Sequence, residues 1–399
     1  MPSYLNALGL ICALGHGKQT VASALFAGDA SGMRKQTGWV TDRSLTVGAV
    51  GAELPPIPAG MQAAASRNNQ LLLAAAQEIE PQIREAIERY GADRVGVVLG
   101  TSTSGIHEAS QAIASHVNTG VVPEGYRYSQ QEIAAPAAFL ADWLELSGPV
   151  YCLSTACTSS ARALLSAHRL LQQGLCDAVL CGGVDSLCRL TLNGFGALEA
   201  VSAERCNPFS INRQGINIGE GAALFLMTRQ AEDEASSIAL FGGGASSDAH
   251  HISAPEPQGL GAQQAMRMAL ANAGIQAADI GYLNLHGTAT QHNDAMESLA
   301  VRAIFPAGVP CSSSKPLTGH TLGAAGALEA AFCWLSLSAY NPDNLLPPHL
   351  WDGQGDPQLP ALNLTTPGTR LATGRPRRLM SNSFAFGGSN TSLIIGDVP

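Results

Sequence analysis

Short, continuous apolar runs alternate along the chain with longer stretches in which alanine and leucine recur at helical spacing. Residues 95–99, 150–153 and 222–227 have the length of strands, whereas residues 71–89 and 263–273 have the length and periodicity of helices. Strands that are apolar throughout are typical of sheets covered by helices on both faces. The alternation therefore predicts an α/β protein with a largely buried sheet.

Three segments of the first half recur, in the same order, in the second half. Residues 99–103 resemble 286–290, the strand and helix around Cys157 resemble 309–312 and the helix after His320, and 181–184 resemble 386–389. This order predicts a duplicated α/β unit. Polar residues cluster around 229–237, so we expect halves spanning residues 1–233 and 234–399.

Charge and cysteine usage exclude several classes of protein. The net charge is -9 and charged residues make up only 13% of the 399, which argues against a nucleic-acid partner. Nine cysteines without CxxC spacing predict neither a disulfide framework nor a metal site. With no signal-type N-terminus, we expect a cytoplasmic protein. The apolar run 324–340 carries Glu329 and is too short and polar for a membrane span, so it predicts a buried helix.

Cys157 is the first candidate catalytic residue. It stands where the apolar run 150–153 gives way, through small residues, to a helical pattern that ends near Gly174. The N–H groups and the positive dipole at a helix N-terminus favour a thiolate, which is a nucleophile with an oxyanion-binding backbone beside it. The alternative is a small buried cysteine without a catalytic role.

His286 and two threonines form the second candidate element. His286 ends the predicted strand 280–283 and should project toward whatever the following loop faces. Thr288 and Thr290 alternate, so their hydroxyls should point the same way and could hold a polar substrate arm. A structural histidine in a satisfied loop is the alternative.

His320 stands just ahead of a helix rich in glycine and alanine, whose N-terminus should keep the imidazole neutral. Lys315 and Glu329 are isolated charges in an uncharged neighbourhood, so a buried ion pair is expected. The alternative for Lys315 is a solvated side chain.

Residues 382–390 form the last element, a turn with Phe386 at its middle. The following Gly387 and Gly388 permit unusual backbone geometry that could aim N–H groups at an oxyanion, although Phe386 could equally be core. One cysteine and two neutral histidines without a carboxylate partner do not describe a protease. Two imidazoles donating to one carbonyl oxygen would stabilise an enolate while the cysteine holds an acyl group. This set predicts carbon–carbon bond formation by decarboxylative Claisen condensation.

Four runs carry a resemblance that covers essentially the whole chain. They are Thr-Ala-Cys-Thr-Ser at 155–159, His-Gly-Thr-Ala-Thr at 286–290, Lys-Pro-Leu-Thr-Gly-His at 315–320 and Phe-Gly-Gly-Ser-Asn at 386–390. The chain resembles a β-ketoacyl-[acyl-carrier-protein] synthase of the I/II type, a condensing enzyme of the thiolase fold. The resemblance implies a five-layer αβαβα fold of two related halves. It also implies an acyl carrier protein as partner, and a homodimer or a heterodimer with a related ketosynthase-like subunit.

The resemblance also implies roles for individual residues. Cys157 would be acylated, His286 and His320 would assist decarboxylation, and Lys315 and Glu329 would organise the site. The N–H groups of Cys157 and Phe386 would form the oxyanion hole, with Phe386 gating the acyl pocket. Thr288, Thr290, Phe384, Gly387 and Gly388 would bind substrate, and Arg67 and Arg205 would dock the carrier. No metal and no cofactor beyond the carrier's phosphopantetheine arm are expected.

Three departures from the family's usual pattern favour a specialised enzyme that makes a polyene, polyketide or unusual acyl chain. Ala385 replaces a usual glycine, Gln214 replaces the aspartate of an Arg-Asp-Gly run, and residues 101–107 differ near the expected acyl pocket. No other cysteine lies in a glycine-rich loop like that of a thiolase, and His320 replaces the asparagine of initiation-type synthases. The remaining alternative is a non-catalytic chain-length subunit, which usually lacks the cysteine.

Overall fold

The computed structural model describes residues 1–232, 237–373 and 376–398, and the expected boundary between residues 233 and 234 lies outside them. In chain order the elements are β1 (Ser3–Cys12), β2 (Gly15–His16), α1 (Lys18–Ala27), β3 (Met33–Val40), β4 (Arg43–Gly48), η1 (Gln62–Ala64), α2 (Arg67–Glu78), α3 (Glu80–Tyr90), β5 (Val95–Gly100), α4 (Ile106–Thr119), η2 (Tyr128–Gln131), α5 (Ala135–Leu144), β6 (Val150–Leu153), α6 (Ser159–Gln172), β7 (Ala178–Asp185), α7 (Arg189–Ala197), β8 (Gly221–Thr228), β9 (Ile238–Ser247), α8 (Leu260–Ala273), η3 (Ala277–Asp279), β10 (Ile280–Asn284), α9 (Gln291–Ile304), β11 (Pro310–Ser312), α10 (Lys315–Thr318), η4 (Leu322–Ala324), α11 (Ala325–Leu337), β12 (Asn363–Leu364), β13 (Arg378–Phe384) and β14 (Ser389–Asp397).

The main strands of the two halves follow one topology. Among the described residues the sheet order is β12-β11-β10-β13-β14-β9-β1-β8-β7-β5-β6. If the short outer strand β12 is left aside, each half contributes five strands, in the order β11-β10-β13-β14-β9 from one edge and β6-β5-β7-β8-β1 from the other. Strands at the same place in the two orders make the same parallel or antiparallel pairs. The two five-stranded units meet where β1 pairs with β9, over Ser3 with Leu240 and Tyr4 with Ala239. This is the arrangement that a duplicated α/β unit would give.

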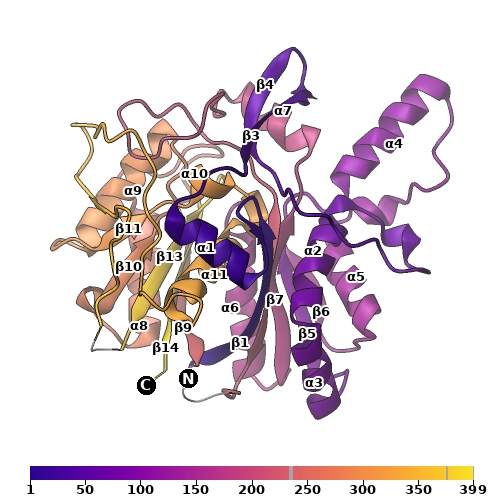
Figure 1. Cartoon of the computed structure of the whole chain (residues 1–399), viewed down its shortest axis with the longest axis horizontal. Coiled ribbons are helices and arrows are strands. Elements are labelled where there is room, and N and C mark those ends of the chain that lie inside the picture. The colour runs from indigo at the N-terminus through magenta and orange to yellow at the C-terminus, as the bar shows by residue number, and fades with distance from the viewer. Residues whose placement is uncertain (233–236, 374–375, 399) are drawn as a thin grey trace.

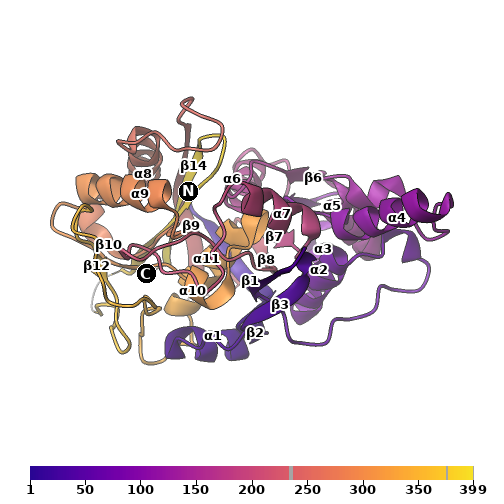
Figure 2. The ribbon, with the colours of Figure 1, turned by 90° about the horizontal axis from the view of Figure 1, so that it is seen from above.

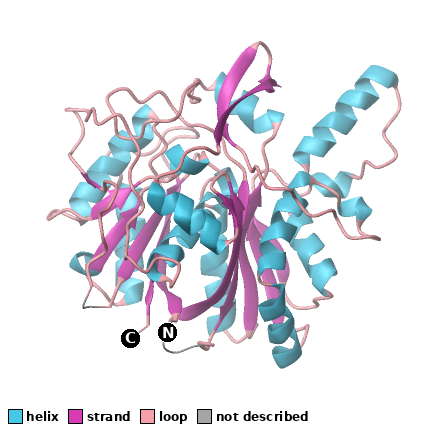
Figure 3. Ribbon diagram, in the orientation of Figure 1, coloured by secondary structure: helices cyan, strands magenta, loops and turns pink. Residues whose placement is uncertain are grey.

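Helices cover the outer face of each unit and also fill the space between them (Figures 1 and 2). Helices α2 and α5 pack on the outer face of the first unit, and α8 and α9 cover that of the second. Helices α6 and α11 lie between the units and contact each other, and the strands of both sheets run on either side of them (Figure 3). The layers are therefore helix, sheet, helix, sheet, helix.

The crossing of α6 and α11 is close enough to require glycine. A Cβ atom on Gly326 of α11 would lie 2.7 Å from the Ala161 Cβ and 2.8 Å from its backbone nitrogen. Contacts that short do not occur, so any larger residue would push the two helices apart. Small side chains on both helices thus set how closely the halves approach.

The structure corrects two details of the predicted elements. The expected helix 71–89 is two helices, α2 and α3, because Pro81 in the first turn of α3 cannot continue the hydrogen bonding of α2. The glycine pair at 182–183 lies inside β7, whereas Gly387 and Gly388 lie in the turn between β13 and β14. These two segments are not equivalent, and the counterpart of β7 is β13 itself. Within the described chain, no helix combines the length and apolar character needed to cross a bilayer.

Candidate active site

Cys157 lies in the tight turn between β6 and α6, two residues before Ser159, the first residue of the helix. The turn is held by the Ser159 hydroxyl, which accepts from the Thr155 N–H at 2.9 Å and donates to the Ala156 carbonyl at 2.6 Å. Ala156 adopts a left-handed backbone with φ of 52°, a strained conformation for a residue with a side chain. This geometry places the cysteine as predicted, at the strand-to-helix turn.

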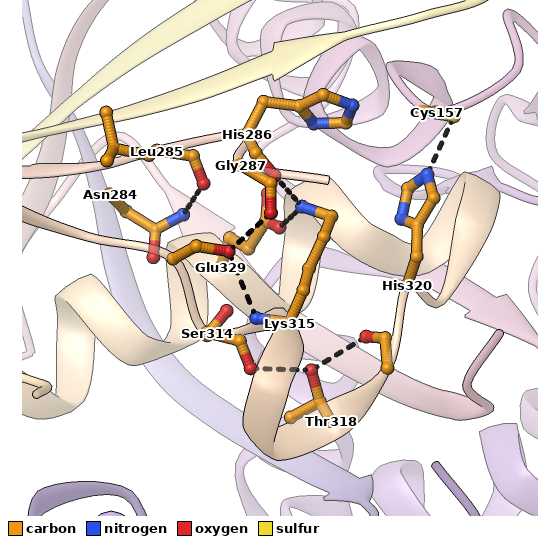
Figure 4. A network of polar contacts seen from close by, with 12 residues as sticks. Cys157, Asn284, Leu285, His286, Gly287, Ser314, Lys315, Thr318, His320 and Glu329 are labelled. Atoms are coloured by element: carbon orange, nitrogen blue, oxygen red, sulfur yellow. Dashed lines mark hydrogen bonds and ion pairs between the residues drawn. The ribbon is translucent and has the colours of Figure 1, made fainter. Parts of the chain in front are cut away.

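The structure brings both histidines to this thiol, and all three side chains come from different segments. His320 follows α10, and its Nε2 lies 2.9 Å from the Cys157 Sγ (Figure 4). His286 follows β10, and its ring meets that of His320 edge-on, with centroids 5.3 Å apart. The Cys157 sulfur and one ring nitrogen of each histidine all lie within 4.8 Å of one another. The thiol comes from the first half of the chain and the imidazoles from the second.

Both imidazoles are neutral at pH 7. Burial, followed by the charge of Lys315, holds the pKa of His286 and His320 well below its usual range. The expected neutrality of His320 thus has another cause than the helix N-terminus, because α11 begins only at Ala325. The Nδ1 atoms of both rings are buried without a hydrogen-bond partner among the described residues. Nothing therefore restricts the ring proton to Nδ1.

The expected thiolate at Cys157 is wrong. Burial raises the pKa of the thiol to about 12, opposed by Lys315 and reinforced by Glu329 and Asp185. The side chain is only 6% exposed, and the cost of burying a charge exceeds the help from the helix N-terminus. The resting pair is accordingly a neutral thiol beside a neutral imidazole.

A raised thiol pKa has a direct consequence for alkylation of Cys157. With a pKa of about 12, the thiolate fraction rises roughly tenfold per pH unit between pH 6 and 10. The alkylation rate by iodoacetamide, followed at the Cys157 peptide by mass spectrometry, should therefore climb through this range without a plateau. A plateau beginning near pH 7 would instead reveal a thiolate paired with an imidazolium.

Lys315 and Glu329 form a buried ion pair beneath His286, as the sequence predicted. Their side chains are 2% and 3% exposed, and Nζ lies 2.6 Å from Oε1. The same ammonium donates to the main-chain carbonyl of His286, so the pair holds the backbone that carries the imidazole (Figure 4). The solvated alternative for Lys315 is excluded.

Two carboxylates that sequence reasoning missed support the loop of His286. Glu297 of α9 accepts from the N–H groups of His286 and Gly287, each at 2.7 Å, and Asp294 accepts from that of Ala289 at 3.2 Å. Burial raises the pKa of Glu297 to about 8 and that of Asp294 to about 6. Their spacing of three residues places both on one face of α9. This spacing is the sequence signal by which the two carboxylates could have been found.

Asp185, at the end of β7, is a third missed carboxylate. Its Oδ1 accepts from the N–H groups of Ser102 and Thr103 and from the hydroxyls of Thr101 and Thr103, and its Oδ2 accepts from the Ala324 N–H at 3.2 Å. Asp185 thus ties the loop after β5 to the segment after His320. Residues 101–103 of the unusual run 101–107 therefore serve to bind the Asp185 carboxylate.

A cavity of about 730 Å³ opens onto the thiol and both imidazoles. Its wall includes most of the predicted substrate-binding residues, and the hydroxyls of Thr288 and Thr290 lie 3.0 Å apart, as their alternation suggested. Lining residues that were not singled out as site residues include Phe195, Leu198, Arg213, Gln214, His251 and His292. The cavity can hold an extended acyl or pantetheine-like chain with the thiol at its inner end.

The loop 384–390 places its members differently. Phe384 and Phe386 line the cavity, with the Phe386 ring 5.5 Å from that of Phe195, and the Phe386 N–H has no partner among the described residues. Gly387 and Gly388 are not among the lining residues, and their N–H groups donate to the carbonyls of Ile252 and Ala385, respectively. Their expected place in substrate binding stays a prediction, and the Phe386 N–H is available to an oxyanion.

The two expected docking arginines differ in their availability. Arg67 forms a two-pronged ion pair with the buried Glu220, through Nε at 2.7 Å and Nη2 at 2.5 Å. The Arg67 side chain is 35% exposed, and its role as a docking residue stays a prediction. Arg205 is exposed and lacks a carboxylate partner in the described part of the chain.

The chain is similar to several curated proteins and solved structures. The chain is 32% identical over 364 residues to Nodulation protein E of Rhizobium meliloti, covering 88% of each protein. It is 30% identical over 344 residues to 3-oxoacyl-[acyl-carrier-protein] synthase 2 of Staphylococcus aureus, covering 82% of this chain and 83% of that one. A chain of the structure titled "Ketosynthase (ApeO) in Complex with its Chain Length Factor (ApeC) from Xenorhabdus doucetiae" superposes with a TM-score of 0.92 at 47% identity, over 100% and 98% of the two chains.

The superposition confirms the predicted thiolase-like α/β fold. Residues 27–233 match the family described as "Beta-ketoacyl synthase, N-terminal domain", and residues 239–350 match "Beta-ketoacyl synthase, C-terminal domain". Both matches include residues of the thiol–imidazole cluster. Since they cover most of the sequence in the family's own order, this chain belongs to the beta-ketoacyl synthase family.

Proposed function

We propose that the chain condenses an acyl group, held on Cys157, with a malonyl thioester on an acyl carrier protein. The contact that carries this proposal is the 2.9 Å approach of the His320 Nε2 to the Cys157 Sγ, beside a second neutral imidazole in an open cavity. Condensing enzymes transfer acyl groups, and the chain's relatives include 3-oxoacyl-[acyl-carrier-protein] synthases.

The first half-reaction loads the cysteine. As the Cys157 sulfur attacks the thioester carbonyl, its proton passes to the His320 Nε2, which solves the problem of a thiol with a high pKa. The oxyanion is stabilised by the N–H of Phe386 together with that of Cys157. The carrier's thiol then leaves with the proton, and the acyl group remains on Cys157.

The second half-reaction uses both imidazoles as hydrogen-bond donors. With Nδ1 unpartnered, each neutral ring can carry its proton on Nε2 and donate to the malonyl thioester oxygen. Loss of carbon dioxide leaves an enolate whose carbon attacks the acyl carbonyl on Cys157. The new carbon–carbon bond forms as the bond to sulfur breaks, and the sulfur takes up a proton from solvent, because the malonyl carboxylate leaves as carbon dioxide and supplies none. The carrier then holds a 3-ketoacyl chain two carbons longer.

The substrates arrive on the phosphopantetheine arm of a carrier protein, which we place along Thr288 and Thr290. We propose no metal and no cofactor beyond this arm, and a cytoplasmic setting in which the catalytic thiol stays reduced. The 47% identical neighbour is one chain of a structure described as a ketosynthase in complex with its chain length factor. This supports a heterodimer with a related subunit. The departures at Ala385 and Gln214 favour a specialised acyl chain such as a polyene or polyketide.

The alternative, a chain-length subunit without catalysis, is disfavoured by the site itself. Such a subunit needs neither a nucleophile nor two desolvated imidazoles, yet this chain keeps all three groups buried and in contact. In a subunit without catalysis, burial of the thiol and the two imidazoles would lower the free energy of unfolding with no gain in function. We therefore assign the chain to the catalytic partner of any such pair.

Intact-protein mass spectrometry tests the proposal. The protein, with its partner subunit where one is needed, is incubated with acyl carrier proteins bearing saturated, unsaturated or aryl-capped acyl groups. We expect one mass gain that maps to Cys157, with the fastest group identifying the substrate class. No gain from any thioester would contradict a catalytic role.

A further inference from the structure

Three side chains that commonly bind metal ions meet at the inner end of the cavity. The thiol–imidazole cluster, which we define by Cys157, His286 and His320, is buried, with no member more than 6% exposed. Among the described residues, no other set of three or more histidines, cysteines or carboxylates is spaced closely enough to share an ion. Cys157 and His320 are 163 residues apart in the sequence, so the spacing of cysteines along the chain could not reveal this set.

The spacing of the three ligand atoms suits a small tetrahedral ion. Zn²⁺ binds a cysteine sulfur at about 2.3 Å and a histidine nitrogen at about 2.0–2.1 Å, which places its ligand atoms about 3.3–3.6 Å apart. In the cluster, the Cys157 sulfur lies 2.9 Å from the His320 Nε2 (Figure 4), and no two of the three ligand atoms are more than 4.8 Å apart. Side-chain shifts of about 1 Å would therefore bring all three atoms onto one ion.

The kind of donor and the open cavity decide which ion would bind. One sulfur and two imidazole nitrogens suit Zn²⁺ and related thiophilic ions, whereas Mg²⁺ and Ca²⁺ require oxygen ligands. Three protein ligands leave the fourth tetrahedral position free. The cavity of about 730 Å³ reaches all three residues, so it offers both an entry path for the ion and room for a water molecule at the fourth position.

The surroundings of the cluster favour reversible binding. The Lys315 ammonium opposes a further cation, but Glu329, 2.6 Å from it, offsets this charge. Histidines that bind metals usually donate from their second ring nitrogen to a carboxylate or carbonyl, and loss of such a partner lowers metal affinity by about 10–100-fold. The Nδ1 atoms of His286 and His320 have no partner among the described residues. A chelator should therefore remove the ion.

We propose that the thiol–imidazole cluster binds Zn²⁺ in place of the proton between Cys157 and His320, and that the bound ion inhibits the enzyme. The sulfur–zinc bond forms as the thiol proton leaves to solvent, and the two rings donate nitrogen lone pairs, so one proton is released per ion and nothing is oxidised. The sulfur can then no longer attack a thioester. The inhibition rests on the proposed function, whereas the binding does not. The ion is an inhibitor and not a cofactor, because the proposed reaction uses all three groups free of metal.

Co²⁺ tests the binding, because its spectrum reports both its ligands and its geometry. With the full chain, and its partner subunit where one is needed, one equivalent of CoCl₂ should give the visible bands of tetrahedral cobalt and a sulfur-to-cobalt charge-transfer band. About one proton per ion should be released into a weak buffer. ZnCl₂ should displace the cobalt and remove both sets of bands.

Variants locate the ion. Cys157→Ala should lose the charge-transfer band, and His286→Ala or His320→Ala should weaken Co²⁺ binding at least about tenfold. His292→Ala is the matched control, since His292 lines the same cavity but lies outside the cluster, and it should bind Co²⁺ as wild type does. A charge-transfer band of equal strength in wild type and Cys157→Ala would overturn the metal site alone.

Acylation of Cys157 from hexanoyl-N-acetylcysteamine, a small thioester, measures the inhibition. Saturating ZnCl₂ should lower the rate at least about tenfold, and EDTA should restore it. MgCl₂ and CaCl₂ at the same concentration should have no effect. Full acylation rates in protein that carries one Co²⁺ or Zn²⁺ per cluster would overturn the inhibition. A metal-free wild-type protein that no thioester acylates would overturn the proposed function and with it the inhibition, while the cobalt spectrum decides the binding independently.

Discussion

Replacement of Cys157 by alanine is expected to abolish acyl loading and condensation, with a loss of more than about a thousandfold, because no other sulfur lies among the described residues that line the cavity. Decarboxylation of the malonyl carrier should persist, because the two imidazoles that stabilise the enolate are untouched. Carbon dioxide release and the mass of the protein, measured on the same sample, separate the two half-reactions. The Cys206→Ala variant is a matched control, since Cys206 is buried and outside the cavity wall.

The histidines provide the second arm of this experiment. Adding His286→Ala or His320→Ala to Cys157→Ala should remove the residual decarboxylation, since each ring supplies one donor to the enolate oxygen. The neutral state of both rings predicts that this decarboxylation stays level as the pH falls from 8 through the usual histidine range near about 6.5. Decarboxylation that survives the loss of both histidines would contradict the assignment.

Lys315→Met is expected to lower the free energy of unfolding by about 3 kcal/mol or more. It leaves Glu329 buried without its partner and removes the donor to the His286 carbonyl. Burial already raises the pKa of Glu329, so this carboxyl will take up a proton once the ammonium is gone. Urea denaturation at pH 8 measures the loss, and condensation should fall as well because the backbone of His286 is released.

The double variant Lys315→Met/Glu329→Gln separates charge from packing. With both charges absent, no ion is left buried, so much of the lost stability should return. Activity should stay low, because the amide cannot replace the contact between Lys315 and the His286 carbonyl. A double variant no more stable than Lys315→Met would show that packing of the lysine stem, not the orphaned carboxylate, accounts for the loss.

Much of the fold could be read from local pattern. The runs 95–99 and 222–227 are strands β5 and β8 to within one residue at each end, because strands covered on both faces are apolar throughout. The buried helix around Glu329 was expected for the same reason. Local pattern failed where one residue interrupts it, as Pro81 does between α2 and α3.

The residues of the site could be predicted from the sequence, but the pKa of the Cys157 thiol could not. Cys157, His286, His320 and Lys315 meet as their motifs suggested, since each follows a strand or precedes a helix that directs it inward. The thiol pKa was mispredicted because burial comes from segments distant in sequence. Arg67 and Glu220, which form an ion pair, are 153 residues apart in the sequence, and no local sequence pattern predicts such a contact. Glu297 was overlooked because a carboxylate in a helix ordinarily faces water.

The close crossing of α6 and α11 makes reactivity depend on a contact that substrate never touches. Cys157 stands two residues before α6 and His320 five residues before α11, so the separation of sulfur and imidazole follows the separation of these helices. A methyl group added at Gly326 would force the two helices apart at Ala161. This would lengthen the distance over which the thiol proton moves from the Cys157 sulfur to the His320 Nε2. The rate of acyl transfer is therefore tuned from the centre of the molecule, where packing and proton transfer are governed by the same few atoms.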